Sequence, residues 1–215
     1  MLEVVKRYDQ ISAFILCGGT SSRMGEPKGL LKFGDQPLIL RIAGLLEPLV
    51  SAVTVVGSSE CYADLGLAVI EDAGFGITDG KGQSAGPLLG IASALISTRT
   101  EWNVILACDL PYLTAEWLDW LLSRAVASSC QIVMPCNAGG LEPLAAVYRR
   151  ECAQPIIGAL RRELHKVSDA LEQFRIEFLA EGEWAHIDPT GRVLYNMNAP
   201  EDYQEARRWL EGRQP

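Results

Sequence analysis

No stretch of this chain combines the length and the apolar character that a membrane-spanning helix needs. The first ten residues, Met1 to Gln10, carry charges and lack the apolar core of a signal peptide. These two absences disfavour membrane-embedded and secreted proteins. We therefore expect a cytoplasmic protein that does not associate with membranes.

Positive charge is also scarce. Nineteen Lys and Arg residues stand against 27 Asp and Glu residues, which gives a net charge of -8 at pH 7. Nonspecific binding to polynucleotides depends on a basic surface, so we expect no nucleic-acid partner. A small basic pocket inside an acidic protein is still compatible with a single nucleotide.

Metal-binding and redox motifs are missing as well. None of the six cysteines belongs to a C-x-x-C pair, and His165 and His186 lack the spacing of metal ligands. A zinc site or a redox motif is therefore unsupported, and we expect reduced thiols, several of them buried. The cysteines are Cys17, Cys61, Cys108, Cys130, Cys136 and Cys152.

What the chain does have suits one α/β domain. Its 215 residues, 48% of them hydrophobic, can bury a sizeable core. We expect a single domain over 1–215, with 1–10 as an N-terminal extension. Strand and helix patterns alternate, which predicts three layers around a mostly parallel, doubly wound sheet. Expected strands are 11–17, 52–57, 67–71, 103–108, 131–135 and 143–148; expected helices are 37–47, 59–64, 87–98, 114–127, 152–162, 167–173 and 200–211.

The two best-known phosphate-binding motifs do not occur. A Walker A loop needs Gly-Lys-Ser/Thr, but Lys28 lies between a proline and a glycine, and there is no G-x-G-x-x-G. Instead, Gly18 and Gly19 directly follow the first apolar strand pattern. Two consecutive glycines let the backbone turn sharply and approach a ligand closely.

The loop that follows combines backbone donors with cations. Consecutive amides in such a turn form a concave anion site. Arg23 adds a planar guanidinium and Lys28 a point charge, two kinds of fixed positive charge. The loop therefore predicts binding of a nucleotide's phosphates. The backbone groups expected to take part are those of Leu16, Cys17, Gly18, Gly19 and Thr20.

Asp109 follows the apolar run 103–108, where a parallel sheet presents its ligand site. Mg²⁺ takes one or two carboxylates and completes its shell with substrate phosphates and water. We expect Asp109 to hold Mg²⁺ and Thr114 to cap the next helix. A second anion site is expected at Gly86 and Pro87, because the free amides at a helix start can bind an anion.

The pattern L-x-G-G-x-S-x-R-M-G-x-x-K, from Leu16 to Lys28, resembles the signature loop of nucleotidyltransferases that move a nucleoside monophosphate from an NTP to a phosphorylated acceptor. Its continuation to Leu38 makes the chain look most like the molybdenum cofactor guanylyltransferases. D-x-P-Y after residue 108, G-P-L-x-G at 86–90 and N-x-N before residue 199 are further matches. The resemblance implies a Rossmann-like nucleotidyltransferase fold.

The resemblance also implies roles for residues. Asp72 corresponds to an aspartate that contacts the nucleotide, and Gly86 and Pro87 to a segment near the base and ribose. Asn196 and Asn198 correspond to asparagines near the metal and the acceptor. The strand from Glu142 to Tyr148 matches E/H-P-L-x-A-x-Y, which we expect beside the acceptor. Ala199 stands where the family usually has threonine, so the last helix lacks a cap hydroxyl.

The implied reaction transfers GMP from GTP to molybdopterin. The terminal phosphate of molybdopterin, with or without molybdenum, attacks the α-phosphorus of GTP, and pyrophosphate leaves. An anionic phosphate needs no strong general base, so Arg23, Lys28 and Asp109 are expected to act by alignment and charge neutralisation. Proteins that deliver the pterin or load molybdoenzymes are expected as transient partners.

Other functions remain open. Cytidylyltransferases and sugar-phosphate nucleotidyltransferases share the loop type, although the double glycine favours the guanylyl branch. G-x-S-x-G at 82–86, followed by Asp109 and His186, matches a serine hydrolase with Ser84 as nucleophile, but no strand pattern precedes it. A nucleotide-binding regulator without turnover is disfavoured by the set of Arg23, Lys28 and Asp109.

Two local features carry further expectations. The segment Asp72 to Gly86 holds five glycines and either closes over a ligand or is a loose surface connection. Cys17 and Cys108 each precede a predicted ligand loop, so they are expected to lie close together if their strands are neighbours.

Overall fold

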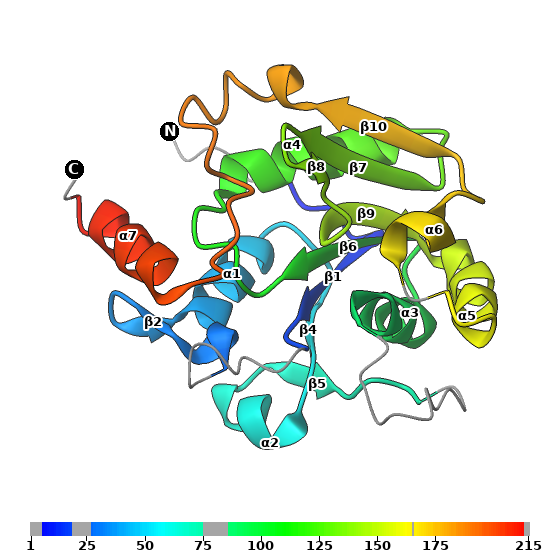
Figure 1. The fold of residues 1–215 in the computed structure, drawn as a ribbon, viewed down its shortest axis with the longest axis horizontal. Helices are drawn as coiled ribbons and strands as arrows, with labels where there is room; N and C mark the ends of the chain where they lie inside the picture. The colour runs from blue at the N-terminus through cyan, green and yellow to red at the C-terminus, as the bar shows by residue number, and fades with distance from the viewer. Residues whose placement is uncertain (1–5, 19–26, 75–85, 165, 213–215) are drawn as a thin grey trace.

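A mostly parallel sheet organises the molecule, in the order β10-β7-β9-β6-β1-β4-β5, with β8 paired to β7 (Figure 1). The structure is a computed structural model that describes residues 6–18, 27–74, 86–164 and 166–212. The strands of this sheet are β1 (Ile11–Leu16), β4 (Val53–Val56), β5 (Ala68–Ile70), β6 (Trp102–Ala107), β7 (Ile132–Asn137), β8 (Gly140–Leu141), β9 (Ala145–Arg149) and β10 (Ile176–Ala180).

Helices cover both faces of the sheet (Figure 1). Ile15 of β1 packs with α1 (Leu38–Leu46) and α4 (Ala115–Ala127), whereas Phe14 packs on the other face with α3 (Pro87–Ser97) and α5 (Ala153–Arg161). Every residue of β1 is buried, as expected for a strand covered on both sides. The expected three-layer α/β fold is therefore confirmed.

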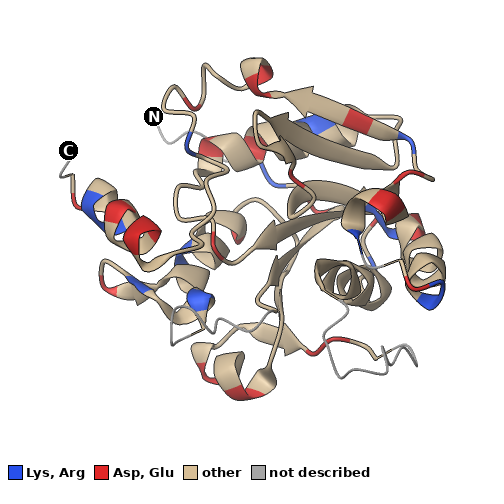
Figure 2. Ribbon diagram, viewed as in Figure 1, with Lys and Arg blue, Asp and Glu red and all other residues tan. Residues whose placement is uncertain are grey.

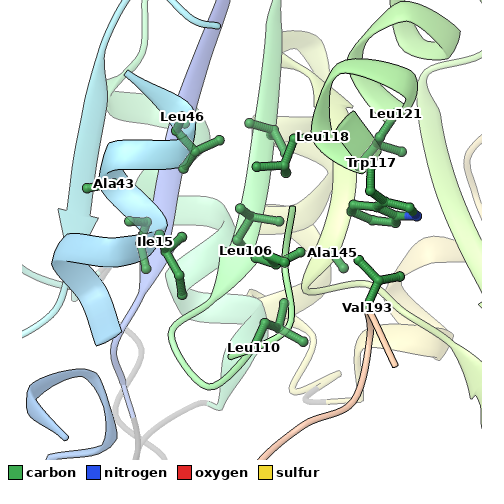
Figure 3. Packing of buried hydrophobic residues seen from close by; sticks show 14 of the residues in the cluster. Ile15, Ala43, Leu46, Leu106, Leu110, Trp117, Leu118, Leu121, Ala145 and Val193 are labelled. Atoms are coloured by element: carbon green, nitrogen blue, oxygen red, sulfur yellow. The ribbon is translucent and has the colours of Figure 1, made fainter. Parts of the chain in front are cut away.

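The core on the α1 and α4 face combines aliphatic and aromatic side chains of the sheet and of the two helices (Figure 3). Leu46 of α1 and Leu118 of α4 lie over Ile15 and Leu106 of the sheet. Thr114 caps α4 as predicted, because the backbone N–H of Trp117 donates to Thr114 Oγ1 at 3.2 Å. The cap and the apolar face of α4 together fix where this helix begins and which side it buries.

All six expected strands and all seven expected helices occur, with ends shifted by at most two residues. The expected helix 59–64 is α2 (Ser59–Tyr62) followed by a 3-10 turn, Ala63–Leu65. The remaining helices are α6 (Val167–Leu171) and α7 (Pro200–Leu210). Three features were not expected: β8, β10 and the small hairpin of β2 (Lys32–Phe33) and β3 (Gln36–Pro37).

The direction of each strand determines which segments meet at the edge of the sheet where ligands are expected to bind. β1 pairs in parallel with β4 and β6, and β4 with β5, so their carboxyl ends share one edge. β9 runs antiparallel to β6 and β7, which brings its beginning to that same edge. The segment before β9 is thereby added to the residues that can form a site.

Charged residues of both signs lie together on the outer elements (Figure 2). α4 carries Glu116 and Arg124, and α7 carries Glu201, Asp202 and two arginines in its last turn. Within the described ranges, no helix is both long and apolar enough to cross a membrane.

Candidate active site

The carboxyl ends of the parallel strands open onto a pocket of about 1060 Å³. Ligand sites commonly measure roughly 300–1,000 Å³, so the pocket can hold a nucleotide together with part of a second substrate. Its described lining comes from every segment that the sheet edge brings together. The lining residues are Leu16, Cys17, Gly18, Pro27, Lys28, Val56, Gly57, Ser58, Cys61, Tyr62, Glu71, Asp72, Gly86, Pro87, Gly90, Ala107, Cys108, Asp109, Glu142, Leu144, Asn196 and Asn198.

Three of the predicted site residues meet at one point of this pocket. Lys28 Nζ donates to Asp109 Oδ2 at 2.8 Å and to Asn198 Oδ1 at 3.2 Å. The Lys28 and Asp109 side chains are 21% and 16% exposed, so the ion pair is largely shielded yet still borders the pocket. The sequence places these residues far apart, and the fold joins them into one charged group.

A backbone hydrogen bond holds the asparagine segment against Asp109. The N–H of Met197 donates to the Asp109 carbonyl at 3.0 Å, and the Met197 side chain is fully buried. Asn196 and Asn198, on either side of this anchor, both line the pocket. The buried methionine therefore fixes the position of two polar neighbours next to the predicted metal ligand.

Asp72 lies between two glycines of the pocket. A Cβ added at Gly18 would lie 3.9 Å from Asp72 Oδ2, and one added at Gly90 would lie 3.7 Å from Asp72 Oδ1. Burial raises the pKa of the Asp72 carboxyl, and a hydrogen bond from Ser93 opposes the rise. Ser93 also accepts from the N–H of Ala73 at 2.9 Å, so it secures the chain just after Asp72.

The predicted second anion site has the geometry of a helix start. Pro87 is the first residue of α3, and Gly86 before it has φ 68° and ψ -164°. This positive φ is open to glycine and strained for other residues. Both residues line the pocket, so the first turn of α3 faces the space that Gly18 and Lys28 also border.

Glu142 is a pocket residue that belongs to the segment before β9. Its carboxylate accepts from Asn137 Nδ2 at 2.9 Å. Burial raises the pKa of the Glu142 carboxyl, the Asn137 hydrogen bond opposes this, and the negative charge of Asp109 adds to the rise. The sequence indicated this strand as a neighbour of the acceptor, but only the antiparallel direction of β9 brings Glu142 toward Asp109.

The expected proximity of Cys17 and Cys108 is confirmed. Their thiols interact, and the Cys108 thiol and burial together raise the pKa of the Cys17 thiol. Tyr62, which the sequence did not indicate, lies against Cys17, and burial raises the pKa of its hydroxyl. Nothing in the local pattern of α2 marks Tyr62 as a pocket residue, because its side chain is simply buried.

Several predicted residues lie outside the described ranges. These are Gly19, Thr20 and Arg23 of the phosphate loop, Ser84 of the hydrolase pattern, and most of the glycine-rich segment 72–86. Leu16, Cys17 and Gly18 are described and line the pocket, and their binding of phosphate stays a prediction.

The model of the MobA-like NTP transferase domain matches residues 13–177 of this chain. The chain belongs to the MobA-like NTP transferase family. It is therefore a nucleotidyltransferase, as the loop from Leu16 to Lys28 led us to expect. The family match begins within β1 and ends within β10, so it spans the whole sheet.

Relatives of this MobA-like protein carry consistent names. A protein of Trichormus variabilis named "Probable molybdenum cofactor guanylyltransferase" is 32% identical over 200 residues, which cover 90% of this chain and 89% of that protein. A protein of Pelotomaculum thermopropionicum with the same name is 31% identical, with 92% of each chain covered.

Solved structures establish the fold of the MobA-like chain independently. Molybdopterin-guanine dinucleotide biosynthesis protein A from Archaeoglobus fulgidus superimposes with a TM-score of 0.77 at 22% identity, covering 94% of this chain and 99% of that one. A 2-C-methyl-D-erythritol 4-phosphate cytidylyltransferase from Thermus thermophilus gives a TM-score of 0.65 at 11% identity, covering 92% of this chain and 98% of that one. A molybdopterin-guanine dinucleotide biosynthesis protein and a cytidylyltransferase thus share this fold, and the fold alone does not select the base.

The serine hydrolase alternative is not supported by the described part of the MobA-like chain. Asp109 pairs with Lys28, and the exposed His186 is not among the described residues that line the pocket. A hydrolase triad would need Asp109 to orient that histidine.

The pocket has donors that suit Mg²⁺. Asp109 supplies one carboxylate, Asn196 and Asn198 supply amide oxygens nearby, and Glu142 is close enough for its charge to interact with that of Asp109. Hard oxygen donors of this kind, with phosphates and water completing the shell, are what Mg²⁺ prefers. The described residues contain no cluster of three or more Cys, His, Asp and Glu side chains that could hold a metal without substrate.

Proposed function

We propose that this protein transfers GMP from GTP to the terminal phosphate of molybdopterin, with or without bound molybdenum, and releases pyrophosphate. The observation that carries the proposal is the charged group of Lys28, Asp109 and Asn198 at the edge of the nucleotide-sized pocket. The names of the relatives, molybdenum cofactor guanylyltransferases, supply the acceptor and the base.

The chain's own residues would act mainly by position and charge. The sequence assigned phosphate binding to the amides of Leu16 and Cys17 as well, but Leu16 lies within the paired strand β1 and the Cys17 N–H donates to the Val56 carbonyl at 2.8 Å. The amide of Gly18, continued by those of Gly19 and Thr20, would hold the triphosphate, and Lys28 with Arg23 would neutralise it as pyrophosphate leaves. Asp72 would contact the nucleotide near Gly86 and Pro87. Asn196 and Asn198 would contact the acceptor phosphate, since amides both donate and accept hydrogen bonds.

Mg²⁺, held by Asp109, would polarise the α-phosphate when bound. The acceptor phosphate is already anionic, so none of these residues is assigned the part of a general base. Lys28 pairs with Asp109 in this structure. It would therefore turn from the carboxylate toward the phosphates as nucleotide and metal enter. A cytoplasmic location and transient contacts with pterin-delivering proteins belong to the same proposal.

Guanine selectivity needs a direct test, because a cytidylyltransferase shares the fold. Thermal unfolding would be followed with GTP, CTP, ATP and UTP, each with and without Mg²⁺. At a concentration 100 times its Kd, a nucleotide that binds only the folded state stabilises it by about 2.7 kcal/mol. We expect the largest stabilisation with GTP and Mg²⁺, followed by pyrophosphate release that depends on molybdopterin. Stabilisation by CTP alone would move the assignment to cytidylyl transfer, and no stabilisation by any nucleotide would overturn the proposal.

A further inference from the structure

Two cysteines lie side by side at the floor of the pocket. β1 and β6 are parallel neighbours, with Leu16 in register with Ala107, so Cys17 and Cys108 occupy the next paired position. The N–H of Cys108 donates to the Leu16 carbonyl at 3.1 Å, which continues the pairing to this point. Both side chains lie on the sheet face that α1 and α4 cover, and both line the pocket.

The surroundings of Cys17 leave its thiol little room except toward Cys108. A Cβ added at Gly57 would lie 3.2 Å from the Cys17 Cβ, and one added at Gly29 would lie 3.5 Å from the Cys17 Sγ. The buried ring of Tyr62 closes the same side. Gly57 is thus the tighter of the two neighbours of Cys17, and a side chain at Gly29 would be in ordinary van der Waals contact with the Cys17 Sγ.

The spacing of the two backbones suits a disulfide. Adjacent strands lie about 4.8 Å apart, and disulfides commonly join Cα atoms about 4.4–6.8 Å apart. Paired positions of neighbouring strands also direct their side chains to the same face. A bond between Cys17 and Cys108 is therefore within reach, although it would draw the two Cβ atoms to the roughly 3.5–4.5 Å that a disulfide requires.

We propose that Cys17 and Cys108 are an oxidation site, at which a low-molecular-weight disulfide converts the two thiols into a reversible intramolecular disulfide. One cysteine thiol first loses its proton, its sulfur attacks a sulfur of the small disulfide, and one small thiol leaves with that proton. The Cys108 thiol and burial raise the pKa of the Cys17 thiol, so we expect this step to be slow at pH 7 and faster at alkaline pH. The other cysteine sulfur then displaces the second small thiol, which takes the second proton. The protein loses two electrons, and the small disulfide gains them.

The position of the pair predicts its effect on the pocket. Gly18 directly follows Cys17, and Asp109 directly follows Cys108. A sulfur–sulfur bond of about 2.05 Å would pull both segments together just where the phosphates and the metal are proposed to bind. The effect on the pocket rests on the proposed function. Oxidation should weaken nucleotide binding, and bound nucleotide should slow oxidation.

The experiment uses the full chain and oxidised glutathione. Remaining thiols are alkylated, the protein is digested without reduction, and linked peptides are identified by mass spectrometry. We expect a peptide pair joining Cys17 and Cys108 that disappears after dithiothreitol. GTP with Mg²⁺ at ten times its Kd should slow its formation about tenfold, since only the free pocket reacts. The oxidised protein should bind GTP at least about tenfold more weakly.

Matched variants separate this pair from the other thiols. Cys130→Ala removes a partly exposed thiol that is not among the described residues lining the pocket, and it should leave the linked peptide and its effect on GTP binding intact. Cys17→Ala should abolish the linked peptide and the effect of oxidation on GTP binding, measured by comparing the oxidised variant with the same variant in reduced form. Cys108→Ala allows the same comparison if Cys17→Ala does not fold.

Three results would count against the inference in different ways. Absence of the Cys17–Cys108 peptide at full oxidation, or glutathione attached to Cys61 alone, would overturn the oxidation site. A linked peptide with unchanged GTP affinity would overturn the coupling to the pocket. If the reduced protein bound no nucleotide, the proposed function would fail, while the linked peptide would still establish the oxidation site.

Discussion

At the residue scale, the charge of Asp109 is balanced before any substrate arrives. A carboxylate that is mostly shielded from water is costly to ionise alone, and the Lys28 ammonium at 2.8 Å compensates it. In the proposed reaction the same two groups are used again, Asp109 for the metal and Lys28 for the phosphates. The resting ion pair therefore keeps the site charged and ordered, and substrate binding exchanges its partners.

Replacing Asp109 should separate binding from turnover. Asp109→Asn keeps the side-chain shape but removes the charge that holds the cation, so GMP transfer should fall at least about a hundredfold. GTP affinity should stay within about tenfold of the wild-type value. The measurements are pyrophosphate release and GTP titration at fixed Mg²⁺. Asp64→Asn, which removes the same charge from an exposed turn, is the control, and near-normal transfer by Asp109→Asn would remove Asp109 from the metal role.

Asp72 should make stability depend on pH. Burial raises the pKa of its carboxyl in the folded protein, so the folded state binds this proton more tightly than the unfolded state does. The contribution of Asp72 to stability is then fully present below the unfolded carboxyl pKa of about 3.9 and is lost as pH rises through the folded value.

The variant Asp72→Asn removes this titration. Near pH 7 we expect the variant to unfold at the same or a higher temperature than wild type, although it should bind GTP more weakly. As pH falls toward 4, the wild type should gain stability relative to the variant. Thermal unfolding between pH 4 and pH 8 tests this, and a wild-type advantage that grows with rising pH would contradict the sign.

At the element scale, the start of the helix α7 has only one of the two sets of hydrogen bonds that form a capping box. The Asp202 carboxylate accepts from the N–H groups of Asn198 and Ala199, at 2.7 and 2.8 Å. The side chain of Ala199 cannot accept a hydrogen bond in return, so the cap position has no side-chain partner for the first turn of the helix. The start of α7 matters beyond the helix, because Asn198 lies in the pocket.

Ala199→Thr should complete this cap. A hydroxyl at this position can accept from the first turn and should stabilise the protein by about 1 kcal/mol. For a chain of this length the gain corresponds to a rise in Tm of about 2–4 °C. Ala199→Val has nearly the same shape without the hydroxyl and serves as control. An equal rise for both variants, or none for threonine, would refute the capping argument.

Local patterns predicted the elements well where one face is clearly apolar. α4 could be predicted from Thr114 at its start and Leu118, Leu121 and Leu122 on one side, and all of these have the expected positions. β10 could not be predicted in this way, because Glu177 interrupts its short apolar run. In the structure Phe178 is 52% exposed, so the strand has no fully buried face that a sequence pattern could reveal. Its place in the sheet comes from pairing with β7, a long-range contact that no local pattern encodes.

Prediction of the site residues was also limited where a position depends on long-range strand pairing. Asp72 and Asp109 were predictable because each ends a strand, and parallel strands bring such residues together. Glu142 precedes a strand, so it reaches the pocket only because β9 runs antiparallel. Periodicity indicates that a strand exists but not its direction, and for this reason the position of Glu142 required the structure.

At the scale of the whole molecule, burial falls from the centre of the sheet to its two edges. β1 is buried throughout, whereas β5 and β10 each keep half-exposed or exposed residues. β10 has additional support, because Arg124 of α4 pairs with Glu177 at 2.7 Å and with Glu183 at 2.6 Å. These partly exposed ion pairs join the β10 edge of the sheet to α4, one of the helices that cover the sheet.

Amide hydrogen exchange should follow this gradient. We expect the slowest exchange in β1 and β6 and faster exchange in β5 and β10. Arg124→Ala should accelerate exchange in β10 up to about fivefold, since such pairs contribute at most about 1 kcal/mol. Exchange in β5, at the opposite edge, should not change. Equal acceleration at both edges would mean that the arginine supports global stability rather than β10.

The hydrogen bond from Met197 to the Asp109 carbonyl also has a consequence for biosynthesis. The strands that border the pocket, from β1 to β9, are synthesised well before the segment that contains Met197, so a nascent chain can form this part of its sheet while the pocket still lacks one wall. Only when this last segment docks do the two asparagines reach the charged group. Nucleotide binding would then depend on the docking of this segment, and nascent chains in which it has not yet docked would not sequester the substrates proposed above.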